Sequence, residues 1–191
     1  PARSPSDPLV AMTQRPRHRP APQDAVRADR PEADPIDIAR EIVLRRLTLR
    51  DHSRAELDQA LVENDIPADT RVEILDRFAE LGLVNDQNFA EQWTRARRSS
   101  RKLSRSAVRR ELQTKGVEAE AIEQALEPLD HESEVVLASE LAVKKWRQVQ
   151  GLPRDVAYRR MAGMLARKGY SSSVVTQVVR KVMQGDPEEF A

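Results

Sequence analysis

The chain of 191 residues contains no cysteine. Disulfides, thiolate zinc sites and cysteine nucleophiles are therefore excluded. Only 6 glycines are present, which argues against a glycine-rich loop that cradles phosphates. No apolar run approaches the ~20 residues that span a bilayer, and the first residues lack the apolar core of a secretory signal. These absences predict a cytoplasmic protein without a membrane partner.

The sequence also lacks the patterns that usually carry catalysis. It contains no HExxH, GxSxG or GxxxxGK[ST] motif. The three histidines, His18, His52 and His131, are far apart, and the carboxylates lie within charged helical surfaces. We therefore predict no enzyme, no catalytic residue, no metal site and no cofactor.

Proline is concentrated at the N-terminal end, where residues 1–35 hold eight of the 12 prolines. This segment has too few apolar residues to offset its ordering entropy, so we predict a disordered, Pro/Arg-rich tail. Residues 185–191 are predicted to be frayed. Between these ends apolar residues recur at helical spacing and no alternating strand pattern occurs, which predicts an all-α body.

A helix-ending signal is repeated along the body. Lys115-Gly116 and Lys168-Gly169 each close a helical run and precede one apolar residue, at an offset of 53. Asp65, followed by Ile66, stands at the corresponding place of a third copy. The residue after a helix often adopts the left-handed conformation, which Gly takes freely and Asp tolerates. Ser53 with Glu56 is a possible capping box, and Ser104 and Ser171 stand where N-caps are expected.

The apolar positions follow the same offset, and each copy accommodates one long helix and two shorter ones. We predict a repeat at 36–84 (helices 36–49, 53–63, 68–81), a second at 85–130 (87–102, 104–115, 118–128) and a third at 131–184 (132–149, 154–168, 172–184). The fold class is thus all-α, with three tandem three-helix repeats in an elongated, curved, right-handed array. A single compact bundle is the alternative that this regularity disfavours, and a monomer is the simplest oligomeric state.

Charge alternates in blocks although the net charge is only +1. Residues 54–91 carry ten acids and three bases, so this unit could attract a basic protein. Two basic blocks follow, and Arg, Lys and Ser side chains there suit phosphate or carboxylate oxygens. The alternative is that the charges merely solvate helix faces. The candidate binding residues are Arg95, Arg97, Arg98, Arg101, Lys102, Arg105, Arg109, Arg110, Lys144, Lys145, Arg147, Arg159, Arg160, Arg167 and Lys168.

Aromatic residues make up only 4% of the chain, which argues against a platform for stacking bases. Trp93 and Trp146 occupy equivalent places in their repeats, where the first repeat has Ile42. This equivalence favours core anchors over base-stacking residues.

Four stretches, in this order and spacing, resemble the RecX family of regulatory proteins. They are HSRAELDQALVENDIP, LGLVNDQNFAEQWTRARR, SRSAVRRELQTKGV and YRRMAGMLARKGYSSSVVTQVV, and the resemblance covers roughly residues 36–184. Asn85, where the family often has an acid, and Asn64-Asp65, in place of a more usual Gly, depart from the family pattern. The most specific element is Gly82 to Asp86 followed by Phe89-Ala90.

The resemblance implies a non-catalytic protein that binds the RecA recombinase and its nucleoprotein filament. It also implies inhibition of the RecA ATPase and of strand exchange, and hence modulation of homologous recombination, DNA repair and the SOS response. Weak direct DNA binding is compatible with this role. The alternative function, from a different class, is a direct DNA-binding protein with helix-turn-helix-like units.

Overall fold

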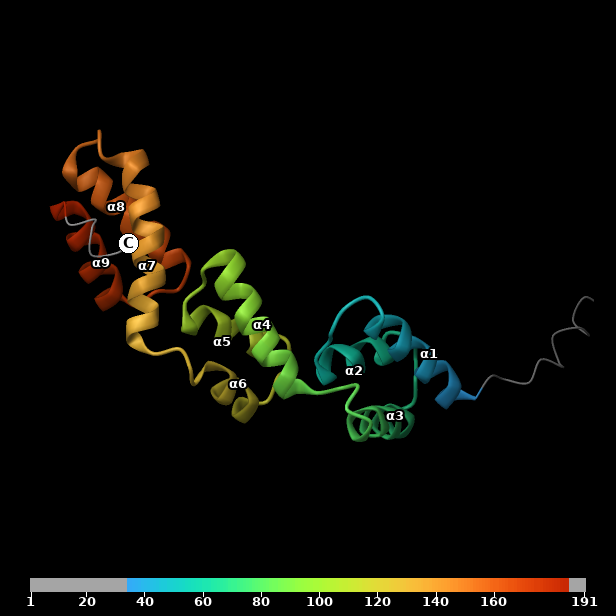
Figure 1. Cartoon of the computed structure of the whole chain (residues 1–191). Coiled ribbons are helices and arrows are strands. Elements are labelled where there is room, and N and C mark those ends of the chain that lie inside the picture. Colours follow the sequence, from blue (N-terminus) through green and yellow to red (C-terminus); the bar gives the residue numbers. More distant parts are fainter. Residues whose placement is uncertain (1–33, 186–191) are drawn as a thin grey trace, which may run out of the picture. The chain divides into compact units, whose positions relative to one another are not determined.

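The computed structural model describes residues 34–185, which form nine helices and no strand (Figure 1). The helices are α1 (Pro35–Leu47), α2 (Arg54–Val62), α3 (Ala68–Glu80), α4 (Asp86–Arg101), α5 (Arg105–Thr114), α6 (Ala119–Leu126), α7 (His131–Val149), α8 (Arg154–Arg167) and α9 (Ser172–Gln184). Every helix expected from the apolar periodicity is present, with ends shifted by at most two residues. The predictions for residues 1–33 and 186–191 lie outside the described residues.

The helix starts carry the caps that the sequence predicts. Ser53 and Glu56 form a reciprocal capping box at α2. The hydroxyls of Ser104 and Ser171 accept hydrogen bonds from the backbone N–H groups of Ala107 and Val174, respectively. These bonds satisfy donors that a helix cannot pair internally, so each cap fixes where its helix begins.

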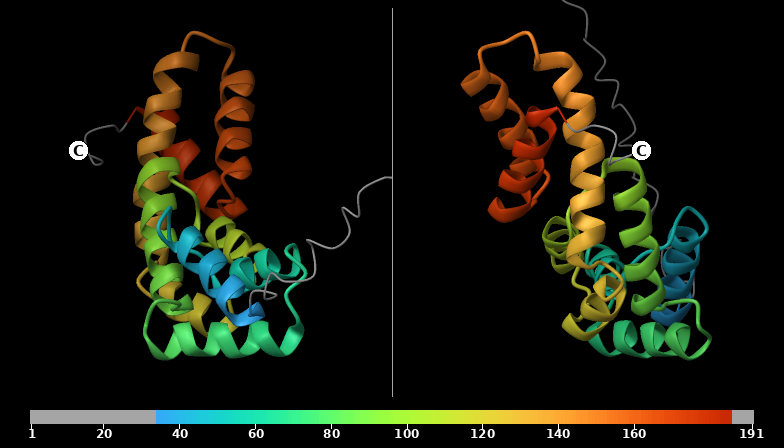
Figure 2. Two further views of the ribbon diagram at one scale, coloured as in Figure 1. Left: turned by 90° about the vertical axis from the view of Figure 1, so that its right-hand side faces the viewer. Right: turned by 60° about the vertical axis from the view of Figure 1, so that its left-hand side comes forward.

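Each set of three consecutive helices encloses its own apolar cluster. α1–α3 bury residues such as Leu57 and Leu61, α4–α6 bury Val108 and Leu112, and α7–α9 bury Met161 and Leu165. Trp93 and Trp146 pack against the second and third clusters but are only partly buried. The three clusters make the fold an all-α series of three-helix units (Figure 2).

The helix terminators have the predicted left-handed geometry. The φ angle is +69° at Gly116, +89° at Gly169 and +57° at Asp65. In each case the following apolar residue donates its N–H to a carbonyl in the last turn of the preceding helix: Ile66 to Leu61, Val117 to Leu112 and Tyr170 to Leu165. The terminators therefore fold their apolar residues back onto α2, α5 and α8.

Two of these terminators also join one unit to the preceding one. At the first joint the carbonyl of Lys115 accepts a hydrogen bond from the hydroxyl of Ser53 at 2.6 Å. At the second joint the carbonyl of Lys168 accepts from the N–H of Ser104 at 3.1 Å, and the carbonyl of Gly169 accepts from the hydroxyl of Ser106 at 2.8 Å. The N-terminus of the second helix in one unit therefore contacts the helix terminator of the next unit.

Glycine at these joints is required by space as well as by backbone conformation. A Cβ atom on Gly116 would lie 2.4 Å from the Cβ of Ala55, and one on Gly169 would lie 2.6 Å from the hydroxyl of Ser104. Asp65 is exposed, so its side chain meets no such obstacle. The Asp in the first copy is therefore explained by its position outside both joints.

None of the helices between residues 34 and 185 is both long and apolar enough to cross a bilayer.

Candidate functional site

A cleft of about 1010 Å³ lies where the first unit meets the second. Its walls come from α1, α2, α4 and α5, with Arg167 of α8 also contributing. Basic side chains dominate the lining, which holds Arg46, Arg50, Arg97, Arg101, Arg110, Lys115 and Arg167 against the carboxylates of Glu56, Glu63 and Glu111. An excess of cations in a concave site favours an anionic ligand.

Trp93 lies in this cleft, and two cations of the chain already lie over its ring. The guanidinium carbon of Arg97 is 3.9 Å from the centre of the ring, and the ammonium of Lys115 is 4.2 Å from it. The indole N–H donates to Glu111 at 2.9 Å. These cation–π contacts and this hydrogen bond give Trp93 a local structural role and leave it poorly placed to stack on a base.

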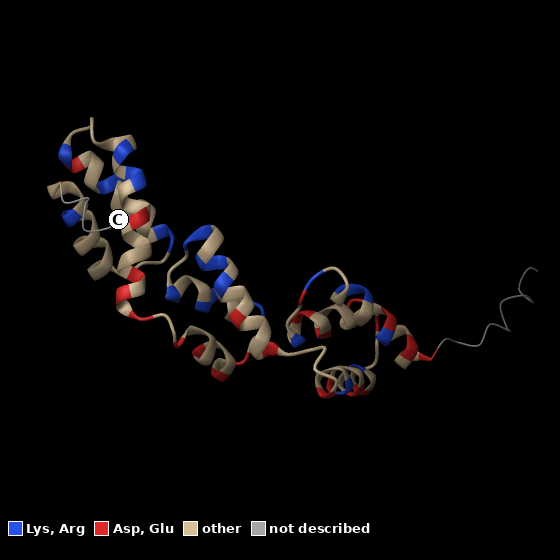
Figure 3. Ribbon diagram, viewed as in Figure 1, with Lys and Arg blue, Asp and Glu red and all other residues tan. Residues whose placement is uncertain are grey.

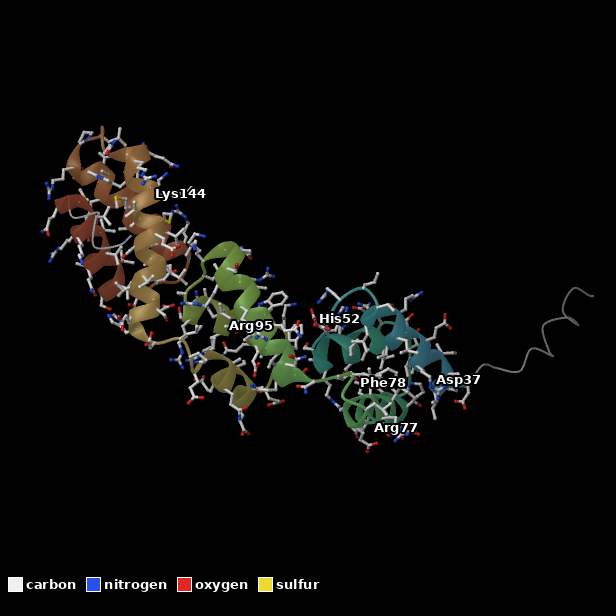
Figure 4. All side chains as sticks on the ribbon, in the orientation of Figure 1. Asp37, His52, Arg77, Phe78, Arg95 and Lys144 are labelled. Carbon is white, nitrogen blue, oxygen red and sulfur yellow. The ribbon has the colours of Figure 1, made fainter. Side chains whose placement is uncertain are left out.

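Glu56 and His52 line the same cleft beside the first joint, where His52 lies at the start of α2 (Figure 4). Burial raises the pKa of the Glu56 carboxyl, but hydrogen bonds from Lys115 and Arg50 outweigh burial and lower that pKa to about 2. Burial, together with the nearby Arg50 cation, lowers the pKa of His52. The carboxylate of Glu56 therefore remains ionised and binds the second unit to the first through Lys115, at 2.6 Å.

The basic block at 95–110 is largely neutralised by carboxylates of the same chain. Arg97 and Arg101 pair with Glu111, and Arg105 and Arg109 pair with Glu123. The remaining pairs are Arg95 with Glu91, Arg98 with Glu134 and Lys102 with Glu140. Of this block, only the side chain of Arg110 has no ion pair with a described carboxylate.

The later block is different, because few acids accompany it. Figure 3 shows Lys and Arg near the end of α7 and along α8, with the acids of α7 mainly nearer its start. Arg159 pairs with Asp155 at 3.0 Å, and both side chains are 72% exposed. Lys168 donates to the carbonyl of Arg101 across the second joint. Within residues 34–185, no carboxylate pairs with Lys144, Lys145, Arg147, Arg160 or Arg167.

Four of these bases surround one hollow of about 420 Å³, which has no carboxylate in its lining. They are Lys145, Arg159, Arg160 and Arg167, with Val156 between them. Arg167 also lines the larger cleft, so the hollow and the cleft share one cation. Lys144, on α7, and Arg95, on α4, line neither site (Figure 4).

Sequence reasoning missed three cations of the cleft: Arg46, Arg50 and Lys115. The first two lie in or just after α1, before the acidic block at 54–91, and Lys115 belongs to a helix terminator. Only the equivalence of Lys115 and Lys168 in the repeat could have pointed to one of them. Between residues 34 and 185 no group of three or more potential ligands could hold a metal ion.

Comparisons with known proteins also divide the chain into three three-helix domains. Models for the first, second and third three-helix domains of RecX match residues 39–78, 85–126 and 132–179. Regulatory protein RecX of Streptomyces coelicolor is 45% identical over 159 residues, which cover 83% of this chain and 85% of that relative. Its counterpart in Thermobifida fusca is 37% identical over 151 residues, covering 79% and 82%, respectively.

Solved structures are similar as well. The crystal structure of RecX from Lactobacillus salivarius superposes with a TM-score of 0.71 and covers 78% of this chain and 97% of that one, at 23% identity. A second crystal structure of a regulatory protein RecX has a TM-score of 0.67 and 25% identity, covering 76% and 72%. By the family models and the sequence identity together, the chain belongs to the RecX family.

Proposed function

We propose that this chain is a non-catalytic regulator that binds RecA on DNA and inhibits the RecA ATPase and strand exchange. It would thereby modulate homologous recombination, DNA repair and the SOS response, as a monomer in the bacterial cytoplasm. Membership of a family whose curated relatives are named regulatory proteins supports the regulatory part. The RecA partner follows from the resemblance to RecX.

The observation that carries the proposal is the unequal pairing of the two basic blocks. Cations at 95–110 are mostly held by carboxylates of the chain, whereas Lys145, Arg160 and Arg167 surround a hollow with no carboxylate. Unpaired cations lose no internal partner when they contact phosphate, so they bind external anions at lower cost. We therefore assign the main contact with the filament to α7 and α8.

Substitutions in the basic block at 95–110 and in α8 differ in what they disturb. Replacing Arg98 or Lys102 would disturb bonds that join the second unit to the third, since their partners Glu134 and Glu140 lie on α7. Lost activity in such variants would not separate a binding defect from a structural one. Arg160 and Arg167 are exposed and without described ion pairs, so they make cleaner test positions.

Co-sedimentation with RecA tests the proposal. We expect strong retention on RecA filaments assembled on single-stranded DNA, and much weaker retention on the same DNA alone. Equal retention in both samples would contradict a RecA-directed function. It would favour the second candidate, a direct DNA-binding protein, especially if binding were sequence-selective and its salt dependence indicated ~6–10 phosphate contacts.

The acids of α6 argue against that second candidate. A recognition helix must approach the major groove between phosphates. In the second unit, the helix in the third position begins with Glu118 as its N-cap and carries Glu120 in its first turn, both exposed. Carboxylates at that end would be repelled by the DNA backbone.

A further inference from the structure

Glu111 holds three donors of α4 in the large cleft. Its carboxylate accepts from the indole N–H of Trp93 at 2.9 Å, from Nε of Arg97 at 2.7 Å and from Nη1 of Arg101 at 3.2 Å. The carboxylate thus occupies the place where these two guanidinium groups would present their donors to an external anion. The Arg101 contact is the longest of the three, and the Arg101 side chain is 56% exposed.

The other two carboxylates of the cleft are bound to different cations. Glu56 pairs with Lys115 and Arg50, and Glu63 lies 3.8 Å from Arg46. Glu111 is therefore the carboxylate that neutralises the α4 wall. Arg110 and Arg167 line the same cleft and have no ion pair with a carboxylate of residues 34–185. Both side chains are exposed and are therefore available to an anion in the cleft.

We propose that the cleft binds phosphodiester groups of single-stranded DNA, and that Glu111 is an internal anion that such a phosphate displaces from Arg101. Glu111 then sets the affinity of the cleft, because every bound phosphate has to compete with it. Contact with phosphate rather than with bases fits the environment of Trp93, since two cations already lie over its ring.

This inference rests on the proposed function in one respect: the single-stranded DNA is taken to be that of the RecA filament. The test therefore uses DNA without RecA. Glu111→Gln removes the charge but keeps an oxygen that can accept from Trp93. Glu127→Gln is the matched control, because Glu127 is exposed in the same unit, has no described ion pair and loses the same charge.

Fluorescence anisotropy of a labelled single-stranded oligonucleotide of mixed sequence, titrated at several salt concentrations, measures the effect. We expect E111Q to bind about three- to tenfold more tightly than E127Q. We also expect its plot of log affinity against log salt to be steeper by about 0.7. In a chain that keeps Glu111, the displaced carboxylate takes up a cation and so cancels the counterion released from one single-strand phosphate. Equal affinity and slope in the two variants, or weaker binding by E111Q, would overturn the inference.

A double-mutant cycle identifies the cation that Glu111 controls. Arg101→Gln should weaken binding only modestly beside wild-type Glu111, where the phosphate has to displace the carboxylate, and should abolish the gain in the E111Q background. A gain that survives Arg101→Gln would overturn the displacement step. RecA inhibition is read separately. Normal inhibition without the E111Q gain contradicts only this inference, and the gain without any inhibition contradicts only the proposed function.

Discussion

The guanidinium of Arg98 lies 2.7 Å from the carboxylate of Glu134, and the two side chains are only 11% and 14% exposed. Glu134 also accepts the backbone N–H of Arg105 at 2.9 Å, at the start of α5. In the sequence, Arg98 is one of eight bases between residues 95 and 110 and cannot be distinguished from the exposed Arg95. Its partner stands 36 residues away, on the next unit, and only the folded chain brings the two together.

Arg98→Ala should lower the free energy of unfolding by about 2–3 kcal/mol, because it leaves the poorly exposed Glu134 without its cation. Arg95→Ala is the matched control, since Arg95 is 71% exposed and lies 3.9 Å from Glu91. Its effect should stay within ~0.5 kcal/mol. Urea unfolding followed by circular dichroism measures both. Similar midpoints for the two variants would show that Arg98 has no special structural role.

The low pKa of Glu56 predicts a pH dependence of stability. Burial opposes ionisation, but hydrogen bonds from Lys115 and Arg50 lower the pKa of the Glu56 carboxyl from its ordinary value of 4.5 to about 2 in the folded chain. Since the unfolded chain binds the proton more readily, stability is fully present above pH ~5 and declines as pH falls towards 2. The protection factors of amides at the first joint, which correct for the slower intrinsic exchange in acid, should therefore fall as pH decreases between these values.

Glu56→Gln serves as the control for this pH effect. The variant cannot gain a proton at position 56, so its first joint should be weaker at neutral pH and less sensitive to acid. An acid dependence of joint opening as steep as in the wild type would contradict the role assigned to Glu56.

At the scale of the elements, each terminator combines a predictable feature with an unpredictable one. The left-handed residue after α2, α5 and α8 follows from the local sequence, because few residues other than Gly, Asn and Asp take positive φ at low cost. That Gly116 also packs against Ala55, which is 61 positions earlier in the chain, is a tertiary contact. Periodicity locates the repeats but does not specify which surfaces of neighbouring repeats meet.

Gly116→Ala and Gly82→Ala separate these two requirements. Both residues have similar positive φ angles, +69° and +71°, but a Cβ on Gly82 would meet nothing within 4 Å. We expect Gly82→Ala to cost ~1 kcal/mol of unfolding free energy for the conformation alone. Gly116→Ala should cost ~2–4 kcal/mol, because Ala55 must also move.

Thermal or urea unfolding compares these two variants, and limited proteolysis between α5 and α6 reports on the first joint. The double variant Ala55→Gly/Gly116→Ala should recover part of the loss by making room for the new methyl group. Equal costs for Gly82→Ala and Gly116→Ala would contradict the docking role of the terminator.

At the scale of the whole molecule, the sequence was sufficient to predict the all-α class and the three-helix units. Apolar spacing and the caps at Ser53, Ser104 and Ser171 are local signals that the folded chain retains. The free cations were less predictable, because Arg101 and Arg160 look equally available in the sequence. Within residues 34–185 of the folded chain, Arg101 is paired with a carboxylate and Arg160 is not, because α5 places Glu111 beside Arg101 of α4. The right-handed curvature of the array stays a prediction.

Inhibition of the RecA ATPase on single-stranded DNA tests the central claim most directly. The wild-type chain should inhibit it, and Arg160→Gln/Arg167→Gln should need a several-fold higher concentration, since two unpaired cations beside the carboxylate-free hollow are lost. A control with the same charge change, Arg45→Gln/Arg77→Gln on the first unit, should inhibit like the wild type. Absence of inhibition by the wild-type chain, or equal inhibition by both double variants, would contradict the account.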